Sequence, residues 1–299
     1  MNFIYLALLG YLLLAIEAAA SKYLLAGRVI NWRLYLFYVS VLSLFGLVFA
    51  PWGLHWWGWK NFWWAFSSGV VFFFSLGFLF FSLTSSAASR VYVLFGAFST
   101  LVGLVLMKLF FEENLNRQEL FSVLLLLTGG FFISFKFTER RFFHNYKKIV
   151  LAGFLAGVSL VLLKDSYDRV NFVSGYIFSR LGIFFPALFF LIVPVLRKKT
   201  FSVRAGRRKI VQSPLWKVIL VKTLAGAGTV LISYSISIGS LTIVNALVAV
   251  QYLITFFLAI WLAAFFREFS KEKIPTVDII FKFIGVFLVV LGVFGVNFS

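Results

Sequence analysis

The chain has 299 residues, of which 62% are hydrophobic and only 13% are charged, and 41 are phenylalanine. Soluble domains are nearer half apolar, so this composition excludes a soluble globular protein and makes lipid the expected solvent. The lack of cysteine excludes disulfides and thiol chemistry, and the net charge of +18 is attributed to membrane topology, since no nucleic-acid-binding motif accompanies it.

The apolar residues fall into ten long runs. A helix needs about 20 apolar residues to cross a hydrocarbon core of about 30 Å, and the runs are near that length. They are continuous and do not alternate, which favours helices over barrel strands. The first run lacks the basic start and cleavage site of a secretory signal, so we expect it to be retained. The expected spans are residues 3–21, 34–51, 62–83, 91–111, 120–137, 149–163, 172–196, 215–238, 241–266 and 277–297.

The loop charges predict an orientation. Lys and Arg gather in the first, fifth, seventh and ninth loops, whereas the even-numbered loops hold little beyond Lys60, Arg117 and Arg169. Basic loops stay in the cytoplasm, so we expect both termini on the extracytoplasmic side of a bacterial plasma (inner) membrane. The basic loops would also suit anionic lipid headgroups. Six tryptophans between residues 52 and 64 are expected to form an interfacial belt rather than a substrate cage.

One spacing occurs twice. Phe110-Phe111-Glu112-Glu113 closes the fourth run, and Phe265-Phe266-Arg267-Glu268 closes the ninth. Glu113 and Glu268 are 155 residues apart, and so are Gly130 and Gly285 in the runs that follow. A fixed offset indicates a duplicated unit, here residues 1–140 and 141–299. Because each unit would hold an odd number of spans, we expect an all-α integral membrane protein of ten helices in two inverted five-helix repeats, an arrangement common in transporters.

The clearest ionisable residues within or directly after the expected spans are Glu17, Lys164, Arg180 and Lys222. Charged groups are costly in hydrocarbon, so each is a candidate for substrate binding. At about 1.5 Å per residue, Glu17 and Lys222 come out level with each other. Lys164 and Arg180 also come out level, nearer the outer side, with Asp165 and Asp168 close by. The alternative is that these groups form structural ion pairs between helices. If functional, Glu17 could carry a coupling proton.

Weaker candidates come from the uncharged polar residues. Tyr234, Asn245, Gln251 and Tyr252 lie on the eighth and ninth runs, and Asn245 and Gln251 do not share a helix face. Glu113 and Glu268 stand at helix ends, where an acid caps the next helix or latches a closed face; with Gly130 and Gly285 they are assigned a structural or gating role. The chain has no G-x-S-x-G, Walker A or H-E-x-x-H pattern, so we expect no enzyme, no cofactor and no metal site.

The two five-span halves resemble the drug/metabolite transporter superfamily, in its EamA-type ten-helix branch. The matching features are the Glu just after the fourth span of each half and the Gly of the following span, here Glu113, Glu268, Gly130 and Gly285. The chain lacks the proline often found in the fourth and ninth spans. It also carries Glu112 and Arg267 where a Gly commonly precedes the Glu, which places it in a divergent branch.

The resemblance implies a monomeric secondary transporter, often an exporter of amino acids or other small metabolites. Its cavity would lie between the halves, lined by the first four helices of each, with Glu17, Arg180 and Lys222 on lining helices. We expect Glu17 to be the coupling site and Arg180 and Lys222 to contact an anionic substrate group. The alternatives are a proton-coupled exporter of cationic drugs, a flippase for lipids or lipid-linked sugars, and a membrane assembly subunit that does not transport.

Overall fold

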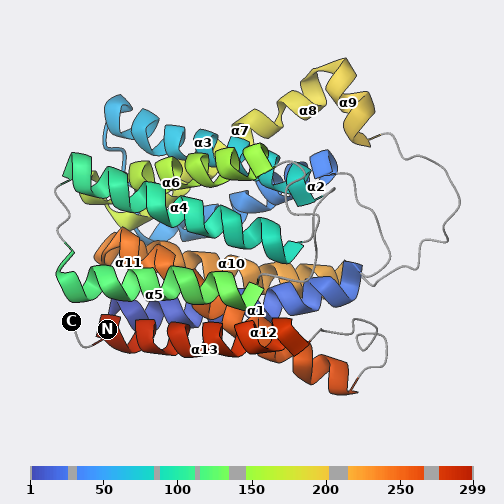
Figure 1. Ribbon diagram of the computed structural model, residues 1–299. Helices are drawn as coiled ribbons and strands as arrows, with labels where there is room; N and C mark the ends of the chain where they lie inside the picture. The colour runs from blue at the N-terminus through green and yellow to red at the C-terminus, as the bar shows by residue number, and fades with distance from the viewer. Residues whose placement is uncertain are drawn as a thin grey trace, which may run out of the picture.

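The computed structural model describes residues 2–25, 32–83, 88–111, 115–134, 146–201, 215–265 and 276–297, and every regular element in these ranges is helical (Figure 1). The elements are α1 Phe3–Leu25, α2 Trp32–Leu42, the 3-10 helix η1 Ser43–Trp52, α3 Trp59–Leu83, α4 Ala88–Phe111, α5 Arg117–Ser134, α6 Tyr146–Arg169, α7 Phe172–Ala187, α8 Phe189–Ile192, α9 Pro194–Phe201, α10 Leu215–Ile238, α11 Leu241–Ala246, α12 Val248–Phe265 and α13 Thr276–Asn297.

The helices match the dimensions of a membrane. Within the described ranges, five segments are long and apolar enough to cross a bilayer, and shorter apolar helices follow the same direction beside them. The five are Trp32–Trp52, Trp59–Leu83, Leu94–Phe111, Tyr146–Arg169 and Phe172–Ile192. The two ends of the chain lie at one end of the bundle (Figure 1). The prediction of an all-α, membrane-type fold is therefore confirmed.

Three of the predicted spans are interrupted. The second is divided between α2 and η1, which contains Pro51. The seventh is divided into α7, α8 and α9, and the last break falls at Pro194, which has no N–H to continue the preceding helix. The ninth is divided at Leu247 between α11 and α12. The sixth span is longer than predicted, because α6 continues through Lys164 to Arg169.

Glycines allow close contacts between helices that are distant in sequence. Small residues let helix backbones approach, which is the main way that helices pack in lipid. On α1, a Cβ at Gly10 would stand 2.9 Å from the carbonyl oxygen of Gly228 on α10. α3 and α7 cross in the same way at Gly69 and Gly182. Helices from the two halves of the sequence are therefore in direct backbone contact.

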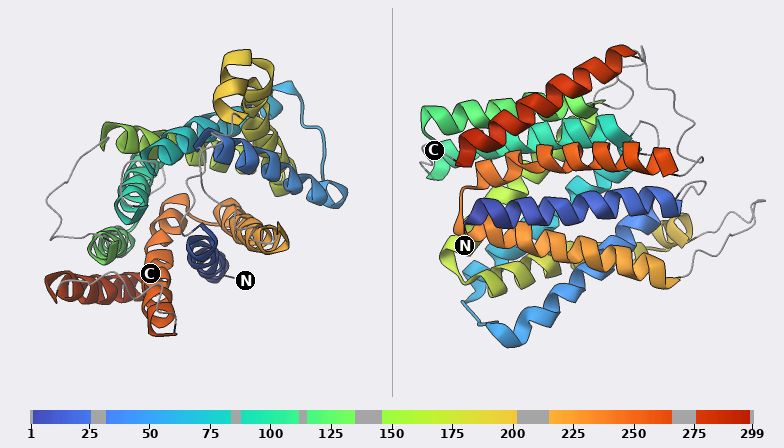
Figure 2. Two further views of the ribbon diagram at one scale, coloured as in Figure 1. Left: turned by 90° about the vertical axis from the view of Figure 1, so that its right-hand side faces the viewer. Right: turned by 90° about the horizontal axis from the view of Figure 1, so that it is seen from below.

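The α5–α13 crossing tests the predicted pair of glycines. A Cβ at Gly285 would stand 2.7 Å from the carbonyl oxygen of Gly129. A Cβ at Gly130 would instead stand 3.1 Å from Cβ of Ala249 on α12. Both glycines thus have packing roles, but with different partners. Figure 2 shows α5 and α13 side by side at one edge of the bundle.

Candidate functional site

Arg180 lies in the middle of α7, facing α10. Its Cζ stands 4.3 Å from the centroid of the Tyr176 ring, which lies one turn earlier on the same helix. Its Nη2 is 3.5 Å from Oγ of Ser233 on α10, a long distance for a hydrogen bond from a charged donor. Its Nε is buried and has no partner. In the described part of the chain, Arg180 makes no ion pair with an acidic side chain.

The end of α6 brings two further polar groups to the same place. The Ser166 and Tyr167 side chains are buried, and neither hydroxyl has a hydrogen-bond partner. The Tyr167 hydroxyl lies near Ser233 without a hydrogen bond of good geometry, and it is close enough to Arg180 to interact electrostatically. We call these five residues, Ser166, Tyr167, Tyr176, Arg180 and Ser233, the Arg180 cluster.

The Arg180 cluster holds most of the unsatisfied polar atoms found in the described ranges. Of four buried side-chain nitrogen or oxygen atoms without a partner, three belong to Ser166, Tyr167 and Arg180. A buried polar group without a partner costs about 1–3 kcal/mol, and a charged one costs more. Such groups are uncommon in folded proteins, and their concentration at one place needs an explanation. A ligand with hydrogen-bond acceptors and a negative charge would satisfy all three.

Aromatic rings and small residues hold the cluster in position. Phe172 packs against Tyr176 and Tyr167, with ring centroids 5.5 and 5.3 Å apart. A Cβ at Gly46 of η1 would stand 2.9 Å from the Tyr176 ring and 3.1 Å from Cγ of Arg180, so the side chains of both residues depend on glycine there. The site is thus a cation in an otherwise apolar surrounding, which strengthens its attraction for an anion.

Lys164 and the two nearby aspartates do not join the Arg180 cluster. Lys164 Nζ lies 3.0 Å from Oδ1 of Asp168, one turn along α6, and 3.4 Å from the carbonyl oxygen of Ser237. Asp165 is likewise paired with Arg169, at 2.7 Å. The prediction of one cluster is therefore met in part: Lys164 pairs with Asp168, whereas Asp165 pairs with Arg169, and no ion pair in the described ranges joins Arg180 to either aspartate.

Glu17 and Lys222 lie at a different depth from Arg180. α1 and α10 are antiparallel: Gly10 meets Gly228, and Ser235 Oγ donates to the carbonyl oxygen of Phe3 at 2.6 Å. This register places Glu17 level with positions 221 and 222, as expected. Position 222 is eleven residues before Ser233, or about 16 Å along the helix. The structure therefore does not bring the Lys222 backbone beside Arg180. The Lys222 side chain lies outside the described residues, and Glu17 is half-buried.

The remaining predicted residues mostly make packing contacts. Asn245 Nδ2 donates to Oγ of Ser99 at 3.1 Å, and the Tyr252 hydroxyl donates to the carbonyl oxygen of Tyr92 at 2.8 Å. The Tyr234 ring contacts that of Phe172 at 5.1 Å, at the edge of the Arg180 cluster. Gln251 is half-buried on α12. Glu113 and Glu268 lie outside the described residues.

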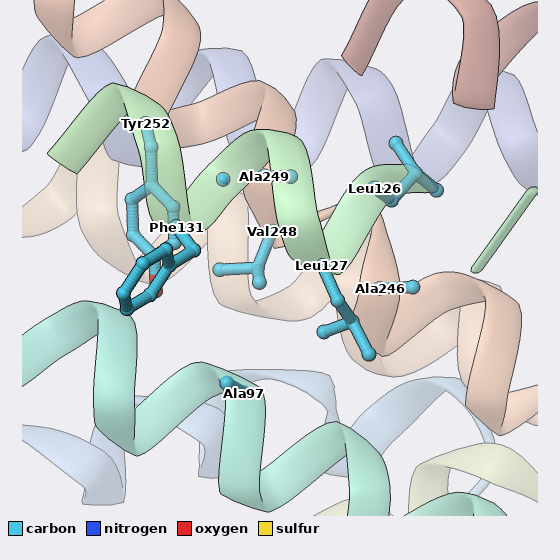
Figure 3. A pocket seen from close by; sticks show the side chains of 9 residues that line it. Ala97, Leu126, Leu127, Phe131, Ala246, Val248, Ala249 and Tyr252 are labelled. Atoms are coloured by element: carbon cyan, nitrogen blue, oxygen red, sulfur yellow. The ribbon is translucent and has the colours of Figure 1, made fainter. Parts of the chain in front are cut away.

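A small apolar hollow, separate from the Arg180 cluster, lies between α4, α5 and the α11–α12 pair (Figure 3). Its volume is about 10 Å³, close to the minimum that a single water needs. It cannot hold a metabolite, and the Tyr252 hydroxyl at its edge is already bonded. Its lining residues are Ala97, Leu126, Leu127, Gly130, Phe131, Ala246, Val248, Ala249 and Tyr252.

The sequence singled out Arg180 but missed its four partners. Ser166, Tyr167, Tyr176 and Ser233 are common residues in membrane helices, and nothing in their spacing marks them except that Tyr176 precedes Arg180 by four positions. No three His, Asp or Glu side chains gather as a metal site would require in the ranges that the structure covers. The cluster offers one positive charge and unpartnered hydrogen-bond donors.

Comparison with known proteins shows a shared fold. Neither a scan of family models nor a search of curated proteins finds a match. Among solved structures, 19 chains match. One of them, described only as the crystal structure of a protein, has 16% sequence identity and a TM-score of 0.65, and the match covers 98% of this chain and 95% of that chain. The helix arrangement therefore recurs, over nearly the whole length, in an experimentally determined structure.

Proposed function

We propose that this chain is a secondary transporter of a small metabolite with an anionic group, the class that includes amino acids. It would have ten spans in two inverted five-helix repeats of the EamA type, and would work by alternating access in a bacterial inner membrane. The observation that carries the proposal is the Arg180 cluster, a half-buried cation whose buried Nε has no partner, beside two unpartnered hydroxyls of α6 and a serine of α10. In membrane proteins, ionisable groups facing the bundle interior mark substrate pathways.

The packing of the helices supports the repeat. Counting α2 with η1, α7 with α8 and α9, and α11 with α12 as single crossings gives ten spans. The first helix of each unit then packs along the third helix of the other: α1 along α10, and α6 along α3. The fifth helices, α5 and α13, pack along each other. Two inverted units related by a two-fold axis would make these reciprocal contacts.

One contact is not reciprocal, which supports alternating access. At the end that holds the termini, α3 and η1 pack on α7. There, Asn171 Nδ2 donates to the carbonyl oxygen of Gly53, and Ser174 Oγ donates to that of His55 at 3.1 Å. The counterpart of the α3–α7 contact would join α10 to α2, and these helices make no comparable contact in the described ranges. Alternating access predicts such an asymmetry between the two ends of the bundle.

The proposal is tested by counterflow in proteoliposomes. Purified protein is screened against amino acids, organic anions, cationic dyes and lipid analogues. We expect the unmodified protein to exchange an anionic solute, and we expect Arg180→Gln to abolish this exchange. Arg197→Gln, the same change at an exposed position of α9, should preserve it. Background flux of every solute would overturn the proposal in favour of a subunit that does not transport. Exchange of dyes or lipids alone would favour the drug-exporter or flippase alternatives.

We further propose Glu17 as the coupling group, since it is half-buried and stands level with a lysine position of the adjacent helix. Transport driven by a pH gradient should be lost in Glu17→Gln, whereas counterflow, which needs no net proton movement, should persist. Gradient-driven transport by Glu17→Gln at the unmodified rate would show that Glu17 is structural.

A further inference from the structure

One edge of the Arg180 guanidinium is only partly satisfied by protein groups. Cζ of Arg180 lies over the Tyr176 ring, 4.3 Å from its centroid, a contact that uses the positive charge and not the N–H bonds. Nε has no partner, and Nη2 has only the 3.5 Å contact with Ser233. Nε and Nη2 present two parallel N–H bonds on one edge, and this geometry matches the two oxygens of a carboxylate.

The charge balance of the site sets the charge of its ligand. The acids nearest along the chain, Asp165 and Asp168, are already paired with Arg169 and Lys164. The site therefore carries a single positive charge, which a monoanion neutralises. A dianion would leave one uncompensated negative charge among apolar residues, and a zwitterion would leave its ammonium without a counter-ion. Each is costly, because an unpaired charge is expensive to bury.

Tyr167 supplies the second donor. Its hydroxyl is buried and has no hydrogen-bond partner. Its ring packs on that of Phe172, which in turn packs on Tyr176, the ring that lies against the Arg180 guanidinium. The hydroxyl therefore stands where an O–H group can donate to an anion on the guanidinium edge. The rings of Phe172 and Tyr234 stand in contact beside it, 5.1 Å apart, and would favour an apolar body on the ligand.

We propose that Arg180 and Tyr167 together bind the carboxylate of a singly charged, apolar monocarboxylate that has no ammonium group. This inference rests on the proposed transport function and narrows its substrate class, away from zwitterionic amino acids and from dianions. Because Nε of Arg180 and the Tyr167 hydroxyl are covered in this conformation, binding requires α7 and α10 to separate locally. Ligand binding would thus be coupled to the relative position of α7 and α10.

Binding to the purified full-length protein in nanodiscs, followed by tryptophan fluorescence, tests the inference. The probes form matched pairs: benzoate against phthalate for charge, and phenylpyruvate against phenylalanine for the ammonium group. We expect benzoate and phenylpyruvate to bind at least tenfold more tightly than their partners. The proposal is overturned if the two probes of either pair bind with equal affinity, or if no probe binds. This test needs only the unmodified protein.

Two variants test the assignment of residues. Tyr167→Phe removes one hydroxyl and should weaken benzoate binding about tenfold or more, as expected for a lost hydrogen bond to a charged group. Arg180→Lys keeps the charge but loses the paired N–H bonds and should weaken it at least as much. Tyr38→Phe, at an exposed tyrosine of α2, is the control. Benzoate binding by Tyr167→Phe at the control affinity would remove Tyr167 from the site.

Binding and flux separate this inference from the proposed function. Selective monocarboxylate binding with no carrier-mediated flux would refute transport and leave the site assignment standing. Flux of amino acids or dianions, with no preference for the monocarboxylate and no effect of Tyr167→Phe, would support transport and refute the inference.

Discussion

The crossing of α3 and α7 at Gly69 and Gly182 gives a quantitative test of the packing. A Cβ at Gly69 would overlap the carbonyl oxygen of Ser179, and one at Gly182 would overlap that of Phe66. The obstructing atoms are backbone on both sides, so no rotamer change can relieve the overlap. Gly69→Ala must therefore push the two helices apart. Arg180 lies between Ser179 and Gly182 on the displaced helix, so the same substitution should disturb the anion site.

The magnitude follows from two opposing terms. Overpacking costs about 1–3 kcal/mol, while replacing a helical glycine by alanine returns about 0.5–1 kcal/mol. We therefore expect Gly69→Ala to destabilise the protein by about 1–2 kcal/mol. Gly226→Ala on α10 is the matched control, because no described atom lies within 4 Å of its added Cβ. There only the favourable term operates, and we expect a gain of about 0.5–1 kcal/mol.

Unfolding by SDS in mixed micelles measures both variants on one scale, with tryptophan fluorescence as the signal. Gly69→Ala should unfold at a lower SDS fraction than the unmodified protein, and Gly226→Ala at an equal or higher one. If Gly69→Ala unfolds at the same SDS fraction as the unmodified protein, α3 and α7 are not in backbone contact. If both alanine variants lose stability equally, the effect belongs to glycine replacement in general and not to this crossing.

Three other predictions follow from single contacts. Asn171→Ala removes the N-cap of α7 and its hydrogen bond to Gly53, so it should cost about 1 kcal/mol in the same unfolding assay. It should also make a reporter cysteine, introduced at the end of the bundle that holds the termini, react faster with a water-soluble thiol reagent. An unchanged reaction rate would show that this contact does not close that end. Lys164→Gln breaks an i, i+4 pair whose acid is 50% exposed, together with the 3.4 Å contact to the Ser237 carbonyl. It should cost about 1 kcal/mol or less and leave the transport KM within about twofold, whereas loss of transport would return Lys164 to the substrate site. Tyr252→Phe removes the hydrogen bond to the Tyr92 carbonyl and should cost about 1 kcal/mol with no change in substrate affinity, whereas weakened binding would assign Tyr252 to the site.

The sequence was most informative where the physical signal is local. Continuous apolar runs located the helices to within a few residues, because the requirement to span hydrocarbon acts on each run separately. The break at Pro194 has an equally local cause. The division of the ninth span at Leu247 has no such signal, since neither glycine nor proline stands there. Which glycines meet which helices, such as Gly285 with Gly129, depends on the packing of the whole bundle.

For the site, the sequence found the charges but not their partners. Lys164 and Arg180 look alike as basic residues in apolar runs, and depth alone placed them together. The difference lies one turn away: Lys164 has Asp168 at i+4, whereas Arg180 has Tyr176 and Phe184 at i−4 and i+4. The i, i+4 rule therefore distinguishes a satisfied charge from an unsatisfied one by sequence spacing alone. The contribution of Tyr167 and Ser233 comes from other helices and only the tertiary structure reveals it.

The depth of Glu17 and the depth of Arg180 are both reached by polar positions of one helix, α10. Ser233, beside Arg180, and position 222, level with Glu17, are eleven residues apart, close to three full turns of α10, so both fall on the same face. Gly226 and Thr229 occupy the intervening turns of that face, and both are small. An ion crossing hydrocarbon needs a polar or open surface along its whole path, because each apolar turn adds a desolvation cost. This face of α10 offers such a surface between the coupling candidate Glu17 and the anion site. Movement of one helix, α10, against α7 and α1 would therefore change both levels together, which is the linkage that coupled transport requires.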